Sequence, residues 1–356
     1  MTPTTEQKRP SYLHIEGDIP ADLDDGTFIS LTRKRPLKIY SLGFQPARSI
    51  PEIARWFLHK YASLPFTVLE PFAGAGTTII EGLKYGASVY WLDYHPLSRL
   101  ICRVKTTQFS PAEVLEESSN ILRAAASQKS APETVNFVNK DFWFQKPVQE
   151  GLETLREHIL KSKATTRPML WLALASTVRK TSNSNDGMLL AARRSHIEKI
   201  PKRSRSDVFR YFQLYVDGAV AAIVEWNHFM SGSIKNAKEL PLQDARTLEG
   251  DWTCDAVITS PPYINAMDYV WASKFELHWL GMVQSDEDRL NLYSREIGTE
   301  RIPREECKQL GRTGNRRLDR LIEDVYTGRK YKASRGQNEL RARVVHKYFT
   351  DMREHL

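Results

Sequence analysis

One segment, residues 67–78, constrains the fold of this chain most strongly. It reads Thr-Val-Leu-Glu-Pro-Phe-Ala-Gly-Ala-Gly-Thr-Thr, which predicts a buried strand, a loop of small residues and a helix that begins near Thr77. Gly74 and Gly76 have no Cβ, so a ligand can approach the backbone of this loop closely. The order of strand, glycine loop and helix is typical of nucleotide-type cofactor sites in α/β folds.

The details of this loop argue against two common cofactor classes. It lacks the third glycine of the dinucleotide fingerprint, and no Gly-Lys-Ser/Thr is present to bind phosphates. The next expected strand, 88–93, ends in Asp93, about twenty residues after the glycines, where a carboxylate can accept hydrogen bonds from both ribose hydroxyls. The pattern therefore indicates a cofactor that carries a ribose but no phosphates.

A second motif, Thr-Ser-Pro-Pro-Tyr at 259–263, follows an apolar stretch that predicts a strand at 255–259. Its two prolines fix φ and remove two N–H donors, which leaves carbonyl oxygens free to accept hydrogen bonds. Ser260 and the Pro261 carbonyl can accept from the two hydrogens of an exocyclic amino group on a nucleobase, and Tyr263 offers a flat face for stacking. Taken alone, the motif also fits an ordinary rigid turn after a strand.

These residues resemble the AdoMet-dependent DNA amino-methyltransferases, which modify adenine N6 or cytosine N4. Residues 70–78 are similar to the cofactor loop of that family, and residues 260–263 are similar to its catalytic loop, with serine in the first position as in the cytosine-N4 branch. Two weaker similarities occur in the family's order. Residues 43–51 resemble the segment that covers the AdoMet carboxylate, and residues 242–246 resemble the motif whose acid meets the adenine amino group.

The resemblance implies a Rossmann-like AdoMet methyltransferase sheet of the α/β class, with S-adenosyl-L-methionine as the cofactor and DNA as the partner, in a restriction–modification or related system. A base within a duplex cannot be positioned in such a loop, so the target base is expected to be flipped out. The expected catalytic residues are Ser260, Pro261, Pro262 and Tyr263. The expected cofactor-binding residues are Glu70, Phe72, Gly74, Gly76, Thr77, Asp93 and Asp244.

The composition agrees with a nucleic-acid partner. The chain has 51 basic and 43 acidic side chains, and its net charge of +8 favours a polyanionic partner through counterion release. Its three cysteines share no metal-ligand spacing and are too few for a disulfide framework, so we expect no metal site and a cytoplasmic location. The longest apolar run, 169–175, is too short to span a bilayer, so no membrane contact is expected.

Three parts are expected along the chain. Residues 1–108 contain a lead-in and the AdoMet-binding part of the core, and residues 237–356 contain the catalytic loop and a charged helical segment. Residues 109–236 show helical patterns, which predict an insertion between the second and third strands. Part of this insertion is basic, which fits phosphate contacts but also occurs in solvated loops. The residues assigned to DNA binding are Arg179, Lys180, Arg193, Arg194, Lys202, Arg203 and Arg205.

Local signals predict the ends and faces of individual helices. The first forty residues predict an irregular lead-in, and residues 49–61 predict a helix that is capped near Ser49. Residues 110–113 form a sequence pattern for a capping box, with a helix to about 127. The apolar face of the first helix is expected to consist of Ile53, Trp56, Phe57 and Tyr61.

The C-terminal part does not supply all the strands that the resemblance calls for. Strands are expected near 67–70, 88–93, 239–243 and 255–259. Residues 286–343 are highly charged and contain no apolar run of strand length. We therefore expect an incomplete sheet, either because the chain is truncated or because a second polypeptide completes it.

Two other functions are compatible with the sequence. The same catalytic loop can serve an RNA amino-methyltransferase or another amino-methyltransferase, and a basic insertion does not distinguish RNA from DNA. The other alternative is a catalytically silent DNA-binding subunit of a split methyltransferase, although such a subunit has no need for an intact loop at 260–263.

Overall fold

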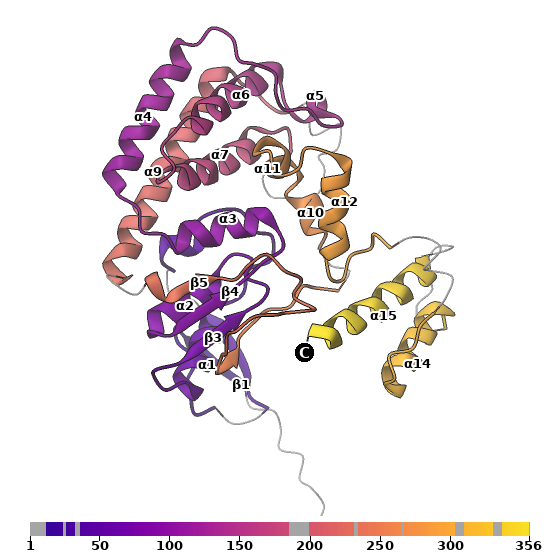
Figure 1. Cartoon of the computed structure of the whole chain (residues 1–356). Helices are drawn as coiled ribbons and strands as arrows, with labels where there is room; N and C mark the ends of the chain where they lie inside the picture. Colours follow the sequence, from indigo (N-terminus) through magenta and orange to yellow (C-terminus); the bar gives the residue numbers. More distant parts are fainter. Residues whose placement is uncertain are drawn as a thin grey trace, which may run out of the picture.

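The computed structural model shows an α/β architecture built on one parallel sheet (Figure 1). It describes residues 12–23, 26–32, 36–184, 199–230, 234–264, 267–302, 310–329 and 337–355. Within these residues the central sheet has four strands in the order β5-β4-β3-β6, and each strand is parallel to its neighbours. The strands are β3 (Thr67–Glu70), β4 (Ser88–Trp91), β5 (Ala237–Glu239) and β6 (Ala256–Val257).

The sheet brings the two sequence motifs to the same edge. Parallel strands place their carboxyl ends together, and this is the edge at which α/β folds bind ligands. The glycine loop follows β3 and the Ser-Pro-Pro-Tyr loop follows β6, and these two strands are hydrogen-bonded neighbours. The Rossmann-like α/β class that the sequence predicts is confirmed.

Three helices lie next to these strands along the chain: α1 (Pro51–Tyr61), α2 (Thr77–Tyr85) and α3 (Pro96–Lys105). Glycines with positive φ mark both ends of α2, Gly76 at 74° and Gly86 at 96°, because a side chain disfavours this backbone conformation. The helix then returns the chain to β4, which gives the parallel pairing of β3 and β4.

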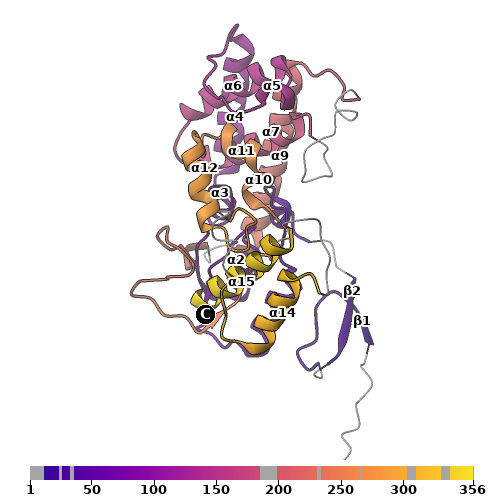
Figure 2. The same cartoon turned by 90° about the vertical axis from the view of Figure 1, so that its right-hand side faces the viewer.

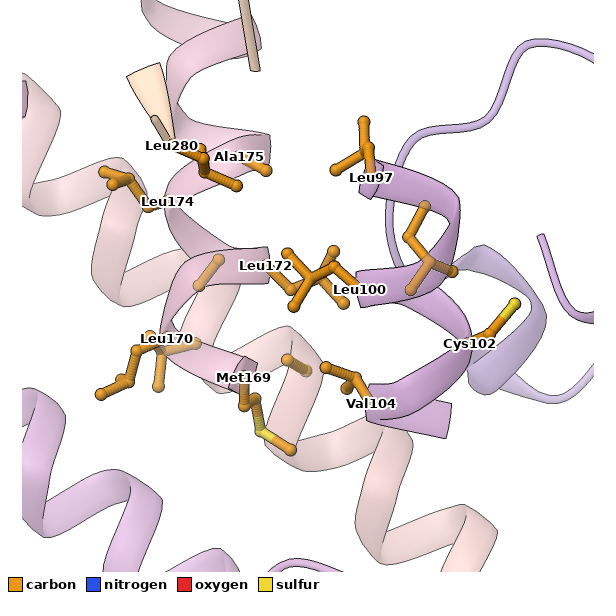
Figure 3. Packing of buried hydrophobic residues seen from close by; sticks show 14 of the residues in the cluster. Leu97, Leu100, Cys102, Val104, Met169, Leu170, Leu172, Leu174, Ala175 and Leu280 are labelled. Atoms are coloured by element: carbon orange, nitrogen blue, oxygen red, sulfur yellow. The ribbon is translucent and has the colours of Figure 1, made fainter. Parts of the chain in front are cut away.

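Helices also fill the chain between α3 and β5 and form the upper part of the molecule in Figure 1. In Figure 3, Leu97, Leu100 and Val104 of α3 face α7 across a packed apolar interface. The same hydrophobic core continues into the sheet, so the boundaries at 108 and 236 stay a prediction. The helices are α4 (Pro111–Ser127), α5 (Lys140–Trp143), α6 (Lys146–Leu160), α7 (Arg167–Thr181) and α9 (Arg205–Met230).

The described residues after the catalytic loop contain helices and no strand. Among the described strands β6 therefore lies at the edge of the sheet, and Val257 is 50% exposed there. The last two helices, α14 and α15, pack against each other and lie away from helices α4 to α7 (Figure 2). The helices are α10 (Tyr269–Ala272), α11 (Lys274–Trp279), α12 (Asp286–Arg295), α14 (Arg316–Tyr326) and α15 (Gln337–His355).

Several local predictions are wrong in detail. The lead-in contains two paired parallel strands, β1 (Tyr12–Glu16) and β2 (Phe28–Thr32), followed by a short 3-10 helix, η1 (Lys38–Ser41). The third strand of the core ends at Glu239, after a 3-10 turn, η2 (Ile234–Asn236), so residues 240–243 form a loop.

Helix α1 begins after Ile50 and has no side-chain cap, so the cap predicted near Ser49 is wrong. Its buried apolar side chains are Ala54 and Leu58, whereas Ile53 and Tyr61 are more than half exposed. No helix in the described part of the chain is long and apolar enough to cross a bilayer.

Candidate active site

The glycine loop after β3 is a tight turn that is fixed against the end of β4. Gly74 and Gly76 have φ of 50° and 74°, in the left-handed region that glycine tolerates best. The Gly76 N–H donates to the Ala73 carbonyl at 2.6 Å, and the Ala73 N–H donates to the Leu92 carbonyl at 3.1 Å. Gly74 lines the cleft at the sheet edge. Gly76 lines neither cleft and is the N-cap of α2.

Asp93 joins this loop to the chain that follows β4. Its Oδ2 accepts the Gly74 N–H at 2.7 Å and its Oδ1 accepts the His95 N–H at 2.8 Å. Burial raises the pKa of the Asp93 carboxyl to about 6, although these N–H donors oppose the rise. Each carboxylate oxygen has a second lone pair, so Asp93 retains the capacity to accept ligand hydroxyls.

Glu70, the last residue of β3, connects the glycine loop to the catalytic loop. Its Oε1 accepts the Thr259 hydroxyl at 2.5 Å and the Phe72 N–H at 3.1 Å. Burial raises the pKa of the Glu70 carboxyl to about 8, and the hydrogen bonds from Thr259, Thr78 and Phe72 oppose the rise. The residue therefore ties the two loops together where both leave the sheet.

Two adjoining clefts form the candidate site, and they share five residues: Ala47, Phe72, Gly74, Ser260 and Tyr269. The larger one has about 730 Å³ of space, including its opening to solvent. Among the predicted site residues, the larger cleft also includes Asp93, Asp244 and Pro262. The smaller cleft also includes Glu70, Thr77, Pro261 and Tyr263.

Asp244 lines the larger cleft, but its carboxylate is already paired. Arg246 Nη2 lies 2.6 Å from its Oδ2, and Arg246 Nε donates to its Oδ1 at 2.9 Å. The hydrogen bonds and charge of Arg246 outweigh burial and hold the Asp244 pKa below its usual value. Arg246 also lies 3.4 Å from Asp351 in α15, so this pair links the cleft to the C-terminal helix.

The segment that is predicted to cover the cofactor carboxylate does reach the cleft, through Gln45 and Ala47. Arg48 holds this segment in place by donating to the carbonyls of Tyr40, at 2.6 Å, and Gly43. Both contacts run from the planar guanidinium of Arg48 to backbone carbonyl oxygens, so they depend on the geometry of arginine as well as on its charge.

The sequence analysis missed several polar residues of the larger cleft, among them Tyr94, Tyr269 and Glu296. Glu296 follows α12, in a charged stretch without any motif, and nothing in the sequence indicates that it reaches the site. The Tyr94 hydroxyl, His95 Nδ1 and Glu296 Oε2 are buried and have no hydrogen-bond partner among the described residues. Buried polar atoms are normally paired, so these three fit a polar ligand such as a nucleoside.

Three of the arginines assigned to DNA binding have partners inside the protein. Arg179 Nε donates to Glu276 Oε1 at 2.6 Å, and its guanidinium lies 3.4 Å from the centre of the Phe44 ring. Arg203 donates to the Thr181 and Ser182 carbonyls, and Arg205 donates to carbonyls of the α4 end. These contacts give all three a structural role.

The remaining residues of that assignment are Lys180, Lys202, Arg193 and Arg194. Lys202 is exposed, and Lys180 lies 6.0 Å from the Tyr211 ring. Arg193 and Arg194 lie outside the described residues. Within the part of the chain that the structure describes, no group of three or more His, Cys, Asp or Glu side chains is arranged to hold a metal ion.

Comparison with known proteins finds the type II methyltransferase M.MvaI of Kocuria varians, which is 24% identical over 276 residues, or 69% of this chain and 58% of that protein. The type II methyltransferase M.MjaII of Methanocaldococcus jannaschii is 23% identical over 77 residues, or 22% of this chain and 14% of that protein. This chain is similar to type II methyltransferases. It spans less than two thirds of the length of either relative. No family model matches the chain, and no solved structure matches it significantly.

Proposed function

We propose that this protein transfers a methyl group from S-adenosyl-L-methionine to an exocyclic amino group of a base in DNA. The observation that carries the proposal is that the glycine loop and the Ser-Pro-Pro-Tyr loop meet in one cleft, linked by the hydrogen bond between Thr259 and Glu70. The similarity to type II methyltransferases supports it. Serine at position 260 favours cytosine N4 over adenine N6, within a restriction–modification or related system.

The residues of the two clefts suit the cofactor in different ways. S-adenosyl-L-methionine, when bound, supplies an electrophilic methyl group on a sulfonium. Asp93, at the end of β4, would hold the ribose hydroxyls, and Asp244 would lie beside the adenine. Phe72, Gly74 and Thr77 line the smaller cleft together with Ser260, Pro261 and Tyr263 of the catalytic loop.

The catalytic loop would position the nitrogen that receives the methyl group. The Ser260 oxygen and the Pro261 carbonyl can accept the two amino hydrogens, which draws the nitrogen lone pair out of conjugation with the ring. Tyr263 is 53% exposed and is free to stack on a base that has left the duplex. The methylated amine then loses a proton to water, so the reaction requires no general base from the chain.

The substrate is tested with tritium-labelled S-adenosyl-L-methionine and equal amounts of duplex DNA and structured RNA. The proposal expects label in DNA, and label confined to RNA would support the RNA amino-methyltransferase instead. Hydrolysis of the labelled DNA to nucleosides and mass spectrometry then distinguishes N4-methylcytosine from N6-methyladenine. Cofactor binding without transfer to either polymer would support the silent DNA-binding subunit.

We further propose that additional strands pair with β6, either from a longer form of this chain or from a second polypeptide. The support is the edge position of β6 among the described strands and the half-exposed Val257 on it. Unpaired strand edges are rarely left open in stable proteins because they promote association.

A further inference from the structure

A buried carboxyl group from the C-terminal part of the chain lies at the larger cleft. The Glu296 side chain belongs to a residue that is only 2% exposed, and it lines the same cleft as Asp93, Ser260 and Tyr269. Its Oε1 accepts the Tyr269 N–H at 2.8 Å, which fixes the carboxyl just behind the catalytic loop. Its Oε2 has no partner among the described residues.

The hydroxyl of Tyr94 is a second unpaired group in this place. It is buried, it has no hydrogen-bond partner among the described residues, and it lies near enough to Glu296 for the negative charge of that carboxylate to raise the Tyr94 pKa. Burial is the largest cause of the raised Tyr94 pKa, so the tyrosine stays a hydroxyl and can donate a hydrogen bond.

Glu296 is also set to stay neutral. Burial raises the pKa of its carboxyl to about 8, and the charge of Asp268 adds to the rise, while the Tyr269 N–H, Arg301 and Thr299 oppose it. The titratable and polar groups around it are Tyr94 after β4, Asp268 and Tyr269 at the start of α10, Tyr293 in α12, and Thr299 and Arg301 beyond it, and Asp93, His95 and Arg295 line the same cleft. At neutral pH the group is therefore a carboxylic acid, with one O–H donor and one carbonyl acceptor side by side.

We propose that Glu296, with Tyr94 beside it, binds the edge of a nucleobase on which a ring nitrogen lies next to an amino group. A carboxylic acid complements this edge, because its O–H donates to the ring nitrogen and its carbonyl accepts from the amino group. The adenine of S-adenosyl-L-methionine carries this edge, whereas both amino hydrogens of the target base are already accepted by Ser260 and Pro261 in the proposed reaction. The assignment thus rests on the proposed function, and it adds a residue from the C-terminal part to the site.

The test uses the full chain with Glu296→Ala, Glu296→Gln and, as the matched control, Glu300→Gln, which alters an exposed carboxyl four residues away. Calorimetry measures S-adenosyl-L-methionine affinity without DNA, and steady-state assays measure KM and kcat for DNA. The proposal expects Glu296→Ala to lower the affinity for S-adenosyl-L-methionine by about tenfold or more. An effect confined to KM or kcat for DNA, with unchanged cofactor affinity, would contradict the inference.

A pH series separates a direct contact from mere support of the Tyr269 backbone. In the parent protein the affinity for S-adenosyl-L-methionine should fall above pH 8, where Glu296 ionises. Glu296→Gln should lack that fall, because an amide keeps its N–H donor. Thermal unfolding of each variant shows that it is folded. The inference is wrong if folded Glu296→Ala matches the parent in cofactor affinity, or if Glu296→Gln keeps the fall above pH 8. The proposed function would still hold in that case, provided that the parent binds the cofactor and transfers the methyl group.

Discussion

Buried carboxyl groups dominate the electrostatics of the candidate site. Glu70, Asp93 and Glu296 have pKa values of about 8, 6 and 8, each raised mainly by burial. S-adenosyl-L-methionine carries a positive sulfonium, which would favour the ionised form of these groups. Binding of such a cation would therefore be coupled to the release of protons from these groups.

Glu70 should make the stability of the protein fall as pH rises. Its pKa in the folded protein, about 8, is above the ordinary glutamate value of 4.5, so the folded state binds more protons than the unfolded state between these values. Stability contributed by the neutral carboxyl is present below pH 4.5 and is lost as the pH approaches 8. Glu70→Gln should flatten this slope in melting temperatures measured from pH 5 to 8.5, whereas Glu300→Gln should not. Equal slopes in all three proteins would contradict the assignment.

Asp93→Ala should weaken S-adenosyl-L-methionine binding by about 1–3 kcal/mol, since it leaves ribose hydroxyls unpaired in a closed site. The change also removes the acceptor for the Gly74 and His95 N–H groups, so unfolding is measured alongside calorimetric affinity. Asp251→Ala, at an exposed position, serves as the control. Unchanged affinity in a folded Asp93→Ala protein would remove Asp93 from the cofactor site.

Tyr263→Ala should abolish methyl transfer while leaving S-adenosyl-L-methionine affinity nearly unchanged. The ring is 53% exposed and contributes little to the core, so its expected role is confined to stacking on the flipped base. Single-turnover transfer and calorimetry on the same preparation measure the two effects. Transfer at the parent rate would show that the loop is only structural.

At the scale of elements, an ion pair holds the helical insertion against the segment that follows the catalytic loop. Arg179 in α7 makes two hydrogen bonds to the fully buried Glu276 in α11, and a third to the Ala272 carbonyl at the end of α10. The insertion is therefore coupled to α10 and α11, which come directly after the catalytic loop in the chain.

Arg179→Met should lower the free energy of unfolding by about 3–5 kcal/mol, because it leaves the Glu276 carboxylate buried without its partner. Urea unfolding measures the loss, and Lys202→Met, an exposed change in the same basic stretch, is the control. A double variant with Glu276→Leu should recover part of the loss, since no unpaired charge remains. Unchanged stability with weaker DNA binding would instead return Arg179 to the DNA interface.

The sequence predicts those features that depend on neighbours along the chain. The strand and turn around Gly74, and the Ser110 side chain that caps α4 by accepting the Glu113 N–H, follow from local residue types. The buried face of α1 cannot be predicted in this way. The largest apolar residues suggest one side of the helix, whereas Arg55 pairs with the buried Glu81 of α2 and the buried apolar side chains are Ala54 and Leu58. Glu296 is also beyond local reasoning, since only the folded chain brings it to Tyr94 and Tyr269.

At the scale of the whole molecule, the unpaired edge of β6 among the described strands is the feature that bears on assembly. This strand pairs only with β3 among the described residues, and its pairing covers just Val68 and Leu69. Strand β3 is therefore paired along its full length with β4 on one side and over only two residues with β6 on the other. Such an edge is a template for a further strand.

We expect isolated residues 1–356 to self-associate through this edge and to gain activity when a longer chain or a second polypeptide supplies the pairing strand. Val257→Lys places a charge on the half-exposed edge position and should reduce self-association, whereas Val257→Thr should not. Light scattering during size-exclusion chromatography measures the association, and tritium transfer to DNA measures the activity of the same fractions. Robust methyl transfer by a monodisperse monomer of residues 1–356 would show that no further strand is needed. The open edge of β6 would then cause no self-association, and it would not impair the catalytic loop that follows β6.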